Sequence, residues 1–303
     1  IAIIQMEDPV TQVIAQSVSR TRAGWFSGLM GVVIFSGSLP ATRLAVMDFD
    51  PVFVTVARAA IAGIIAVLIL MVSRPVRPIR SQWVSLMVVA GGVVVGFPLL
   101  TALALEHISS ARSIVFIGLL PLATAIFGFL RGGERPRAVF WLFSILGSAL
   151  VAGFAATGSE AGALSGDLYM LGAIIVCGLG YAEGGKLSRQ LGGWQVICWA
   201  LVISVVPMAV LCAVTLPEQM GAIGIPAWLG LGYVSLFSML IGFFFWYRGL
   251  ALGGIATVGQ LQLLQPFMGL ILAALILAEP VSPAMIGVTV AVVLCVAGAR
   301  RFA

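Results

Sequence analysis

Charged residues are scarce in this chain of 303 residues, of which only 9% are Asp, Glu, Lys or Arg. An ordinary soluble domain is about a quarter charged and less than half apolar. Here 61% of the residues are hydrophobic and the mean hydropathy is +1.16. A soluble fold cannot hide that much apolar surface from water, and a disordered chain would be polar. Both classes are excluded, and a polytopic membrane protein remains.

Side chains suited to metal binding or catalysis are scarce as well. His107 is the only histidine, and the four cysteines all fall within apolar runs. No cluster has metal-ligand spacing, and no nucleophile has an obvious base beside it. The segment 180–187 (GYAEGGKL) approaches a phosphate-binding loop, but Leu187 stands where Ser or Thr must hold the metal. We therefore expect no enzyme, no cofactor and no metal.

Long apolar runs are abundant instead. A helix needs about 20 apolar residues to cross a bilayer, and the residues here do not alternate as in transmembrane β-strands. Ten runs are separated by short breaks, at about 23–46, 51–72, 82–105, 109–130, 138–156, 168–187, 194–216, 226–250, 255–278 and 283–299. We expect an all-α integral membrane protein with ten transmembrane helices. Residues 1–22 are too polar to span, and we expect them to form a cytoplasmic segment.

The positive charges predict the orientation of these helices, because Lys and Arg gather on the cytoplasmic side. On the expected topology, 13 of the 16 Lys and Arg residues lie on the side of the N-terminus: Arg20, Arg22, Arg74, Arg77, Arg80, Arg131, Arg135, Arg137, Lys186, Arg189, Arg248, Arg300 and Arg301. Both termini are thus expected in the cytoplasm, in a multi-pass protein of a bacterial-type inner membrane. The net charge of +5 indicates orientation rather than nucleic-acid binding, for which no soluble basic domain exists.

The two halves of the chain repeat at a fixed distance. Four pairs of residues are 145 positions apart: Ala111 and Ala256, Pro121 and Pro266, Glu134 and Glu279, and Gly153 and Gly298. Each half holds five runs, and an odd number places the second half upside down in the membrane, as in many secondary transporters. We therefore expect two inverted five-helix repeats, at 23–156 and 168–303, joined by a linker at 157–167.

These landmarks carry a family resemblance. The segments Leu120-Pro121 to Glu134-Arg135-Pro136 and Gln265-Pro266 to Glu279-Pro280 resemble the drug/metabolite transporter superfamily. Over about residues 24–300 the chain resembles its ten-helix EamA-type exporters and, more narrowly, the bacterial aromatic amino acid exporters. The resemblance implies a carrier that exports small organic metabolites, including aromatic amino acids, by alternating access through a central cavity. The two loop motifs are not equivalent, since only the first has an Arg between Glu and Pro.

Other functions remain open beside this one. The first alternative is a broad-specificity drug or metabolite exporter. A membrane-embedded enzyme would need an active site that the sequence does not show, and a channel would need a repeated carbonyl filter or a charged pore ring. The expected partners are a small-molecule substrate and the lipid bilayer, and the oligomeric state is left open.

Polar residues at membrane depth are the main candidates for the site, because buried amides there need partners. Gln260, Gln262 and Gln265 lie in the ninth run, and the last two share one helix face. They can bond the substrate or a neighbouring helix, and we favour the substrate. Aromatic rings and small hydroxyls at similar depth either line the cavity or serve packing and bonding within their own helices: Phe97, Tyr181, Phe237, Trp246, Ser36, Thr101 and Ser235.

Three charged residues and two prolines complete the candidates. Arg58, in the second run, can receive a substrate carboxylate or extend outward to Asp48 or Asp50, and we favour the latter. Glu183 and Lys186 are predicted to form a local ion pair rather than a proton-coupling site, so we expect uncoupled or loosely coupled transport. Pro121 and Pro266 lie near the middles of their runs and predict kinks, either as paired hinges or as static bends.

Overall fold

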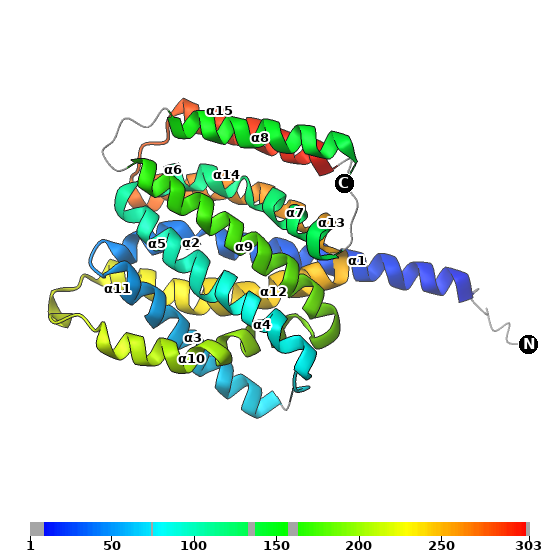
Figure 1. Ribbon diagram of the computed structural model, residues 1–303, viewed down its shortest axis with the longest axis horizontal. Helices are drawn as coiled ribbons and strands as arrows, with labels where there is room; N and C mark the ends of the chain where they lie inside the picture. The colour runs from blue at the N-terminus through cyan, green and yellow to red at the C-terminus, as the bar shows by residue number, and fades with distance from the viewer. Residues whose placement is uncertain (1–8, 74, 133–136, 157–162, 301–303) are drawn as a thin grey trace, which may run out of the picture.

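The computed structural model describes residues 9–73, 75–132, 137–156 and 163–300, which form a bundle of helices without strands (Figure 1). Seven helical stretches are long and apolar enough to cross a membrane. Three shorter apolar helices complete the ten: Trp141–Val151, Leu261–Leu277 and Pro283–Cys295. The prediction of a ten-helix, all-α membrane protein is confirmed.

The first half contains five spans, several of them divided into segments. Span one consists of α1 (Pro9–Ser36) and α2 (Ser38–Val46), and span two is α3 (Pro51–Ser73). Span three consists of η1 (Arg80–Gln82), α4 (Trp83–Val89), η2 (Ala90–Gly96) and α5 (Phe97–His107). Span four consists of α6 (Ser110–Ile117) and α7 (Leu120–Gly132), and span five is α8 (Ala138–Ala156).

The second half follows the same plan. Span six is α9 (Ala163–Leu191), span seven is α10 (Gly193–Val214), and the turn η3 (Met220–Ala222) lies in the next loop. Span eight consists of α11 (Ile225–Tyr233), η4 (Val234–Ile241) and α12 (Gly242–Gly253). Span nine consists of α13 (Ile255–Gly259), η5 (Gln260–Leu264) and α14 (Gln265–Leu277), and span ten is α15 (Pro283–Arg300).

Two helices begin earlier than the sequence predicts. α1 begins at Pro9, so the described part of the expected N-terminal segment 1–22 is helical and continuous with span one. α9 begins at Ala163, inside the expected linker 157–167, and residues 157–162 lie outside the described ones. In both cases the helix continues through polar residues, which hydrophobicity does not mark as helical.

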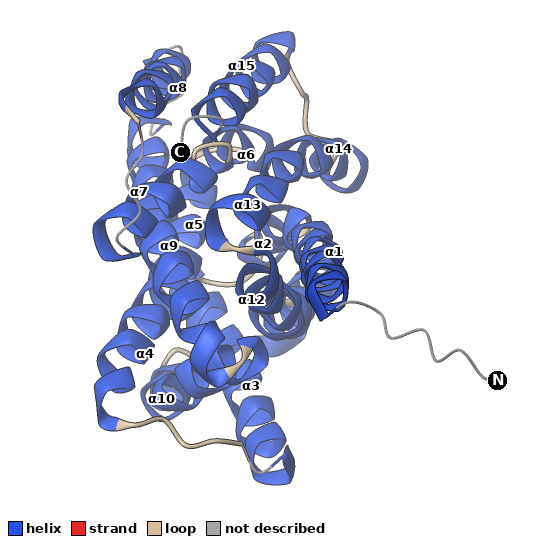
Figure 2. Ribbon diagram, turned by 90° about the vertical axis from the view of Figure 1, so that its right-hand side faces the viewer, coloured by secondary structure: helices blue, strands red, loops and turns tan. Residues whose placement is uncertain are grey.

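The two halves pack as an inverted pair. α1 of span one packs on α12 of span eight, and α9 of span six packs on α5 of span three. Spans one and six are equivalent in the repeat, as are spans three and eight, so each of these contacts is the counterpart of the other. α3 packs on α10 and α8 on α15, which pairs equivalent spans of the two halves. Figure 2 shows these last two pairs at opposite edges of the bundle. The remaining spans therefore form the centre, where the halves meet.

Glycines allow the closest of these contacts, between α1 and α12. A Cβ atom at Gly249 would lie 2.7 Å from the backbone nitrogen of Gly28, and one at Gly24 would lie 2.7 Å from that of Gly253. Any larger residue would push the two backbones apart. This is the small-residue packing that brings membrane helices into contact.

Spans four and nine are broken directly before their central prolines. The amides of Gly118 and Leu119 bond carbonyls three residues back, at 3.2 and 2.9 Å, and α7 then begins with Pro121 in its first turn. In span nine the 3₁₀ segment η5 precedes α14, which holds Pro266 in its first turn. Proline fits there because the first turn needs no backbone donor. α6 packs on α14 and α7 on α13, so the two broken helices lie together.

Spans three and eight carry an irregularity that the sequence does not predict. Each contains a π-helical segment, η2 and η4, which end at Gly96 and Ile241, positions 145 apart. A π-segment inserts an extra residue in a turn, so it changes which side chains face inward, and it occurs often at functional sites.

Candidate functional site

A narrow cavity lies between the two halves. It is lined by four aromatic side chains, three aliphatic ones, and four that are polar or charged: Phe35, Phe97, Tyr181, Phe243, Leu39, Val93, Leu120, Ser38, Arg58, Ser238 and Gln265. Its volume is about 20 Å³, enough for about one water molecule. The cavity is therefore too narrow for an organic solute, which enters only if helices or side chains move.

Arg58 lines this cavity, so the prediction that it extends outward is wrong. Its side chain is 3% exposed, and Nη2 donates to the Ser238 hydroxyl at 3.1 Å. The two acids expected to attract it bind backbone amides instead. Asp50 accepts from the amides of Val52 and Phe53, and Asp48 accepts from that of Gly224 at 2.8 Å.

A short polar chain continues from Arg58. The hydroxyls of Ser238 and Ser38 lie 2.8 Å apart, and both residues line the cavity. Ser238 lies in η4 and Ser38 begins α2, so the chain joins spans one, two and eight. Arg58 Nε is buried and has no hydrogen-bond partner among the described residues. The guanidinium therefore keeps donors that the surrounding protein does not use.

The glutamines of span nine lie in different environments. Gln265 lines the cavity, and its Nε2 donates to the Phe35 carbonyl at 3.4 Å, while its Oε1 has no partner in the described chain. Gln262 is fully buried near Tyr181, and neither of its amide atoms makes a hydrogen bond of normal geometry within the described chain. The Gln260 side chain lies outside what is described. Such unsatisfied amides are costly unless a ligand, water or a rearrangement supplies a partner.

Aromatic rings form one wall of the cavity. The Phe35 ring centroid lies 5.0 Å from that of Phe243 and 6.4 Å from that of Tyr181. Phe97 lines the cavity as expected, whereas Trp246 is fully buried behind Tyr181, with ring centroids 5.5 Å apart.

Phe237 lies elsewhere, contrary to the prediction. It is 44% exposed, outside the cavity lining, and stacks on Tyr233 with ring centroids 5.4 Å apart. It lies between Ser235 and Ser238 in η4, and the π-helical turn there changes which side chains point toward the centre of the bundle.

Three predicted hydroxyls bond within their own helices and do not line the cavity. Ser36 donates to the Val32 carbonyl, Thr101 to that of Phe97, and Ser235 to that of Leu231, at distances of 2.6 to 2.8 Å. The alternative of bonding within their own helices is correct for all three. Ser238 was not predicted from the sequence, because nothing in the sequence marks it or Val93, its equivalent 145 positions earlier, as lining the cavity.

Two pairs of equivalent positions in the repeat line the cavity, and the members of each pair differ in chemistry. Leu120 and Gln265 are also 145 positions apart, and both line it. At both equivalent pairs the first half supplies an aliphatic side chain and the second half a polar one. The two halves thus share a backbone plan but contribute different chemistry.

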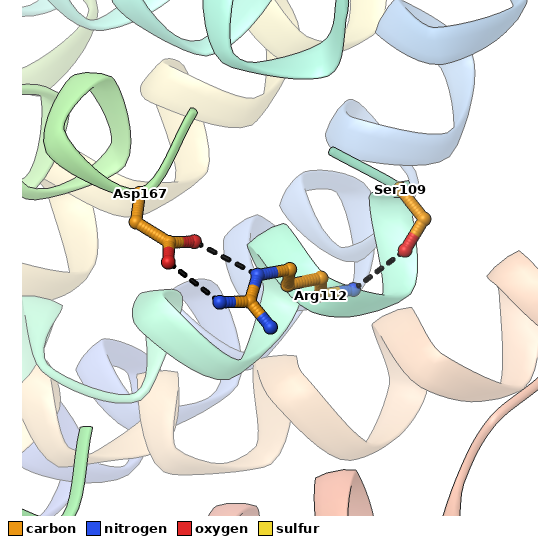
Figure 3. Close-up of polar contacts among 3 residues, drawn as sticks. All are labelled: Ser109, Arg112 and Asp167. Atoms are coloured by element: carbon orange, nitrogen blue, oxygen red, sulfur yellow. Dashed lines mark hydrogen bonds and ion pairs between the residues drawn. The ribbon is translucent and has the colours of Figure 1, made fainter. Parts of the chain in front are cut away.

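Ion pairs hold span four to span six at both ends. At its start, Arg112 forms a two-pronged pair with Asp167, with Nε–Oδ1 at 2.9 Å and Nη2–Oδ2 at 2.6 Å (Figure 3). The guanidinium carbon lies 4.9 Å from the centre of the Phe154 ring. Ser109 caps α6 by accepting from the Arg112 amide at 3.1 Å. Arg112 is therefore a buried structural residue.

At the end of span four, Glu183 binds a different partner from the one predicted. Its Oε2 lies 2.7 Å from Arg131 Nε, and its Oε1 accepts from the Ser85 hydroxyl at 2.6 Å. The carboxylate is 3% exposed. The predicted local pair with Lys186 is wrong, because the carboxylate turns inward between spans three, four and six.

Glu279, a landmark of the repeat, caps a helix. Its carboxylate accepts from the amides of Ser110 and Ala111, at 3.0 and 2.7 Å, at the start of α6. A negative charge there accepts hydrogen bonds from the free amides and interacts favourably with the positive end of the helix dipole. The equivalent Glu134 lies outside the described residues.

Comparisons with known proteins agree with this architecture. A model of the EamA-like transporter family matches residues 22–155 and 164–300, one match for each half. The chain is 64% identical over 286 residues to an uncharacterized transporter, YdeK, of Bacillus subtilis strain 168, covering 94% of this chain and all of that protein. A solved structure described only as "Crystal structure of protein" is similar over 92% of this chain and 96% of its own, with a TM-score of 0.65 and 18% identity. That last likeness supports the fold alone.

Proposed function

Because the chain belongs to the EamA-like transporter family, we propose that it exports small organic metabolites, amino acids and in particular aromatic ones, by alternating access. It is a multi-pass membrane transporter and not an enzyme, as both the family and the 64% identical relative indicate. The observation that carries the proposal is the narrow cavity between two inverted halves, beside the breaks in spans four and nine.

The cavity wall favours a flat or apolar solute with a small polar part. Phe35, Tyr181 and Phe243 offer ring surfaces, and Ser38, Ser238 and Gln265 offer hydrogen-bonding groups. A multiply charged solute such as a nucleotide is disfavoured, because Arg58 is the one charged side chain in the described lining. An aromatic amino acid has both the ring and the polar part.

Opening of the cavity requires one half to move against the other. Spans four and nine lie together, and each is broken next to a proline whose missing donor makes bending there less costly. We propose that these breaks absorb the motion. The ion pairs at both ends of span four then keep it attached to span six as a unit.

Both termini face the cytoplasm of a bacterial-type inner membrane in this proposal. α1 begins and α15 ends at the same end of the bundle (Figure 1). Thirteen of the 16 Lys and Arg residues lie on the same side by loop count, which favours the cytoplasm for that end.

Counterflow in proteoliposomes tests the substrate. Vesicles loaded with unlabelled phenylalanine should take up external labelled phenylalanine with saturable kinetics, and tryptophan and tyrosine should compete. If amphipathic cations or sugars compete and no amino acid does, the chain is a broad metabolite or drug exporter instead. Empty vesicles of the same lipid provide the background.

A further inference from the structure

The geometry points to Arg58 as the receptor for a carboxylate of the transported solute, which makes the substrate a carboxylic acid or an amino acid with a free carboxylate. This inference rests on the proposed transport through the central cavity and names the group that the cavity recognises there.

The first argument is that Arg58 is buried with most of its hydrogen-bonding capacity unused. It lies within span two and is 3% exposed. A guanidinium carries five N–H donors, and within the described chain Arg58 makes one hydrogen bond, to the Ser238 hydroxyl at 3.1 Å. Its buried Nε has no partner in the described chain. An intramembrane charge in this condition is costly unless a counter-charge joins it.

The second argument is that no described acid supplies that counter-charge. The two ion pairs found among the described residues join Arg112 to Asp167 and Arg131 to Glu183. Asp48 and Asp50, the nearest acids in sequence, bind backbone amides. The cavity lining itself contains no Asp or Glu among its described members. The counter-charge is therefore expected from the solute.

The third argument concerns the chemistry around the cation. The planar fork of arginine matches a carboxylate, which can also accept from a hydroxyl beside it. Ser38 and Ser238, 2.8 Å apart, are rotatable hydroxyls at that position. A phosphate would bring a second negative charge, and the described lining holds one cation only. The arrangement thus fits a single carboxylate.

The remaining lining fits the rest of such a solute. The rings of Phe35, Tyr181 and Phe243 provide an apolar wall next to the polar chain. Gln265 Oε1 is a buried acceptor without a partner in the described chain, and it can accept a hydrogen bond from the ammonium group of an amino acid. The carboxylate of the solute would face the full positive charge of Arg58, whereas its ammonium group would face only the amide oxygen of Gln265 and the faces of aromatic rings. Loss of the carboxylate should therefore weaken binding more than loss of the ammonium.

A ligand series with one aryl group tests this directly. Binding of L-phenylalanine, 3-phenylpropionate, L-phenylalaninamide and phenethylamine to the purified full chain in detergent is measured by calorimetry. The two carboxylates should bind at least about tenfold more tightly than the amide and the amine, as expected for a desolvated charge pair. Equal binding of all four overturns the inference.

Variants separate recognition from structural support. Arg58→Gln should bind the carboxylates and the amide equally, and Arg58→Lys should restore part of the preference. Arg43→Gln is the matched control, because Arg43 donates to the Leu105 carbonyl and lies outside the cavity lining. A folded Arg58→Gln protein that keeps the wild-type preference overturns the inference. If that variant does not fold, the preference of Arg58→Lys and the wild-type ligand series decide.

Failure here differs from failure of the proposed function. Carboxylate binding without counterflow leaves Arg58 as the receptor and removes the transport proposal. Counterflow of amino acids that is competed equally by amines and by acids keeps the transport proposal and removes Arg58 as the receptor.

Discussion

At the residue scale, the function proposed for Arg58 depends on neighbours that cannot be predicted from the sequence. The sequence places the cation two turns inside a span, with Asp48 and Asp50 close along the chain. Its true partner, Ser238, is 180 residues away and reaches it from a π-helical turn. Because α-helical spacing does not predict that turn, the inward direction of Arg58 could not be read from the pattern.

Ser238 and Ser235 form a matched pair for a test at this scale. Ser238→Ala removes the hydrogen bond that Arg58 makes among the described residues, whereas Ser235→Ala removes a bond within its own helix. A hydrogen bond to a charged group contributes about 1.5–3 kcal/mol, so Ser238→Ala should raise the KM of counterflow roughly tenfold or more. Ser235→Ala should leave KM within about twofold of wild type. Similar KM values for the two variants would show that Ser238 does not hold the site.

At the element scale, the apolar runs predict where helices lie, and the prolines predict where two of them break. Hydrophobicity and proline act locally, so these features can be read from short windows. The partner of Glu183 could not be read, because Arg131 is on another span and Lys186 is closer along the chain. Likewise, the capping of α6 by Glu279 joins residues 169 positions apart.

The pair that joins Arg112 to Asp167 predicts a large effect on stability. Asp167→Asn keeps the shape of the side chain but leaves a buried guanidinium without its counter-charge. Removing one partner of a buried pair costs about 3–5 kcal/mol, so the unfolding temperature in detergent should fall clearly. Glu106→Asn is the control, since Glu106 is an exposed acid at the end of α5. Equal unfolding temperatures for the two variants would contradict the structural role of the pair.

The breaks in spans four and nine predict a kinetic effect. Pro121→Ala and Pro266→Ala restore a backbone donor at the start of α7 and of α14 and allow each helix to continue through its break. If the breaks are hinges, the maximal rate of counterflow falls several-fold or more while the yield of folded protein stays near wild type. Unchanged rates at unchanged yield would show that the bends are static.

At the scale of the whole molecule, the inverted repeat could be predicted because equivalent residues keep one offset along the chain. The presence of a cavity between the halves could be predicted, but the residues that line it could not. Leu120 and Gln265 occupy equivalent positions, yet one is apolar and the other polar. The repeat preserves backbone geometry, whereas the chemistry of each lining position varies independently. Phe237 was misplaced for a different reason, because the π-helical segment η4 changes which of its side chains face inward.

The absence of acids from the described cavity lining predicts weak coupling to protons. In proteoliposomes with an imposed pH gradient, labelled phenylalanine should reach equal concentrations inside and outside and not exceed them. Accumulation against its own gradient, abolished by a protonophore, would require a titrating group elsewhere on the path.

The most direct test of the account is trans-stimulated exchange of phenylalanine in proteoliposomes. If one closed cavity opens alternately to the two sides, internal phenylalanine should accelerate entry of labelled phenylalanine, with saturation, and Arg58→Gln should abolish the saturable component at normal folded yield. Entry that rises linearly with concentration and ignores internal substrate would contradict a carrier with its site at this cavity.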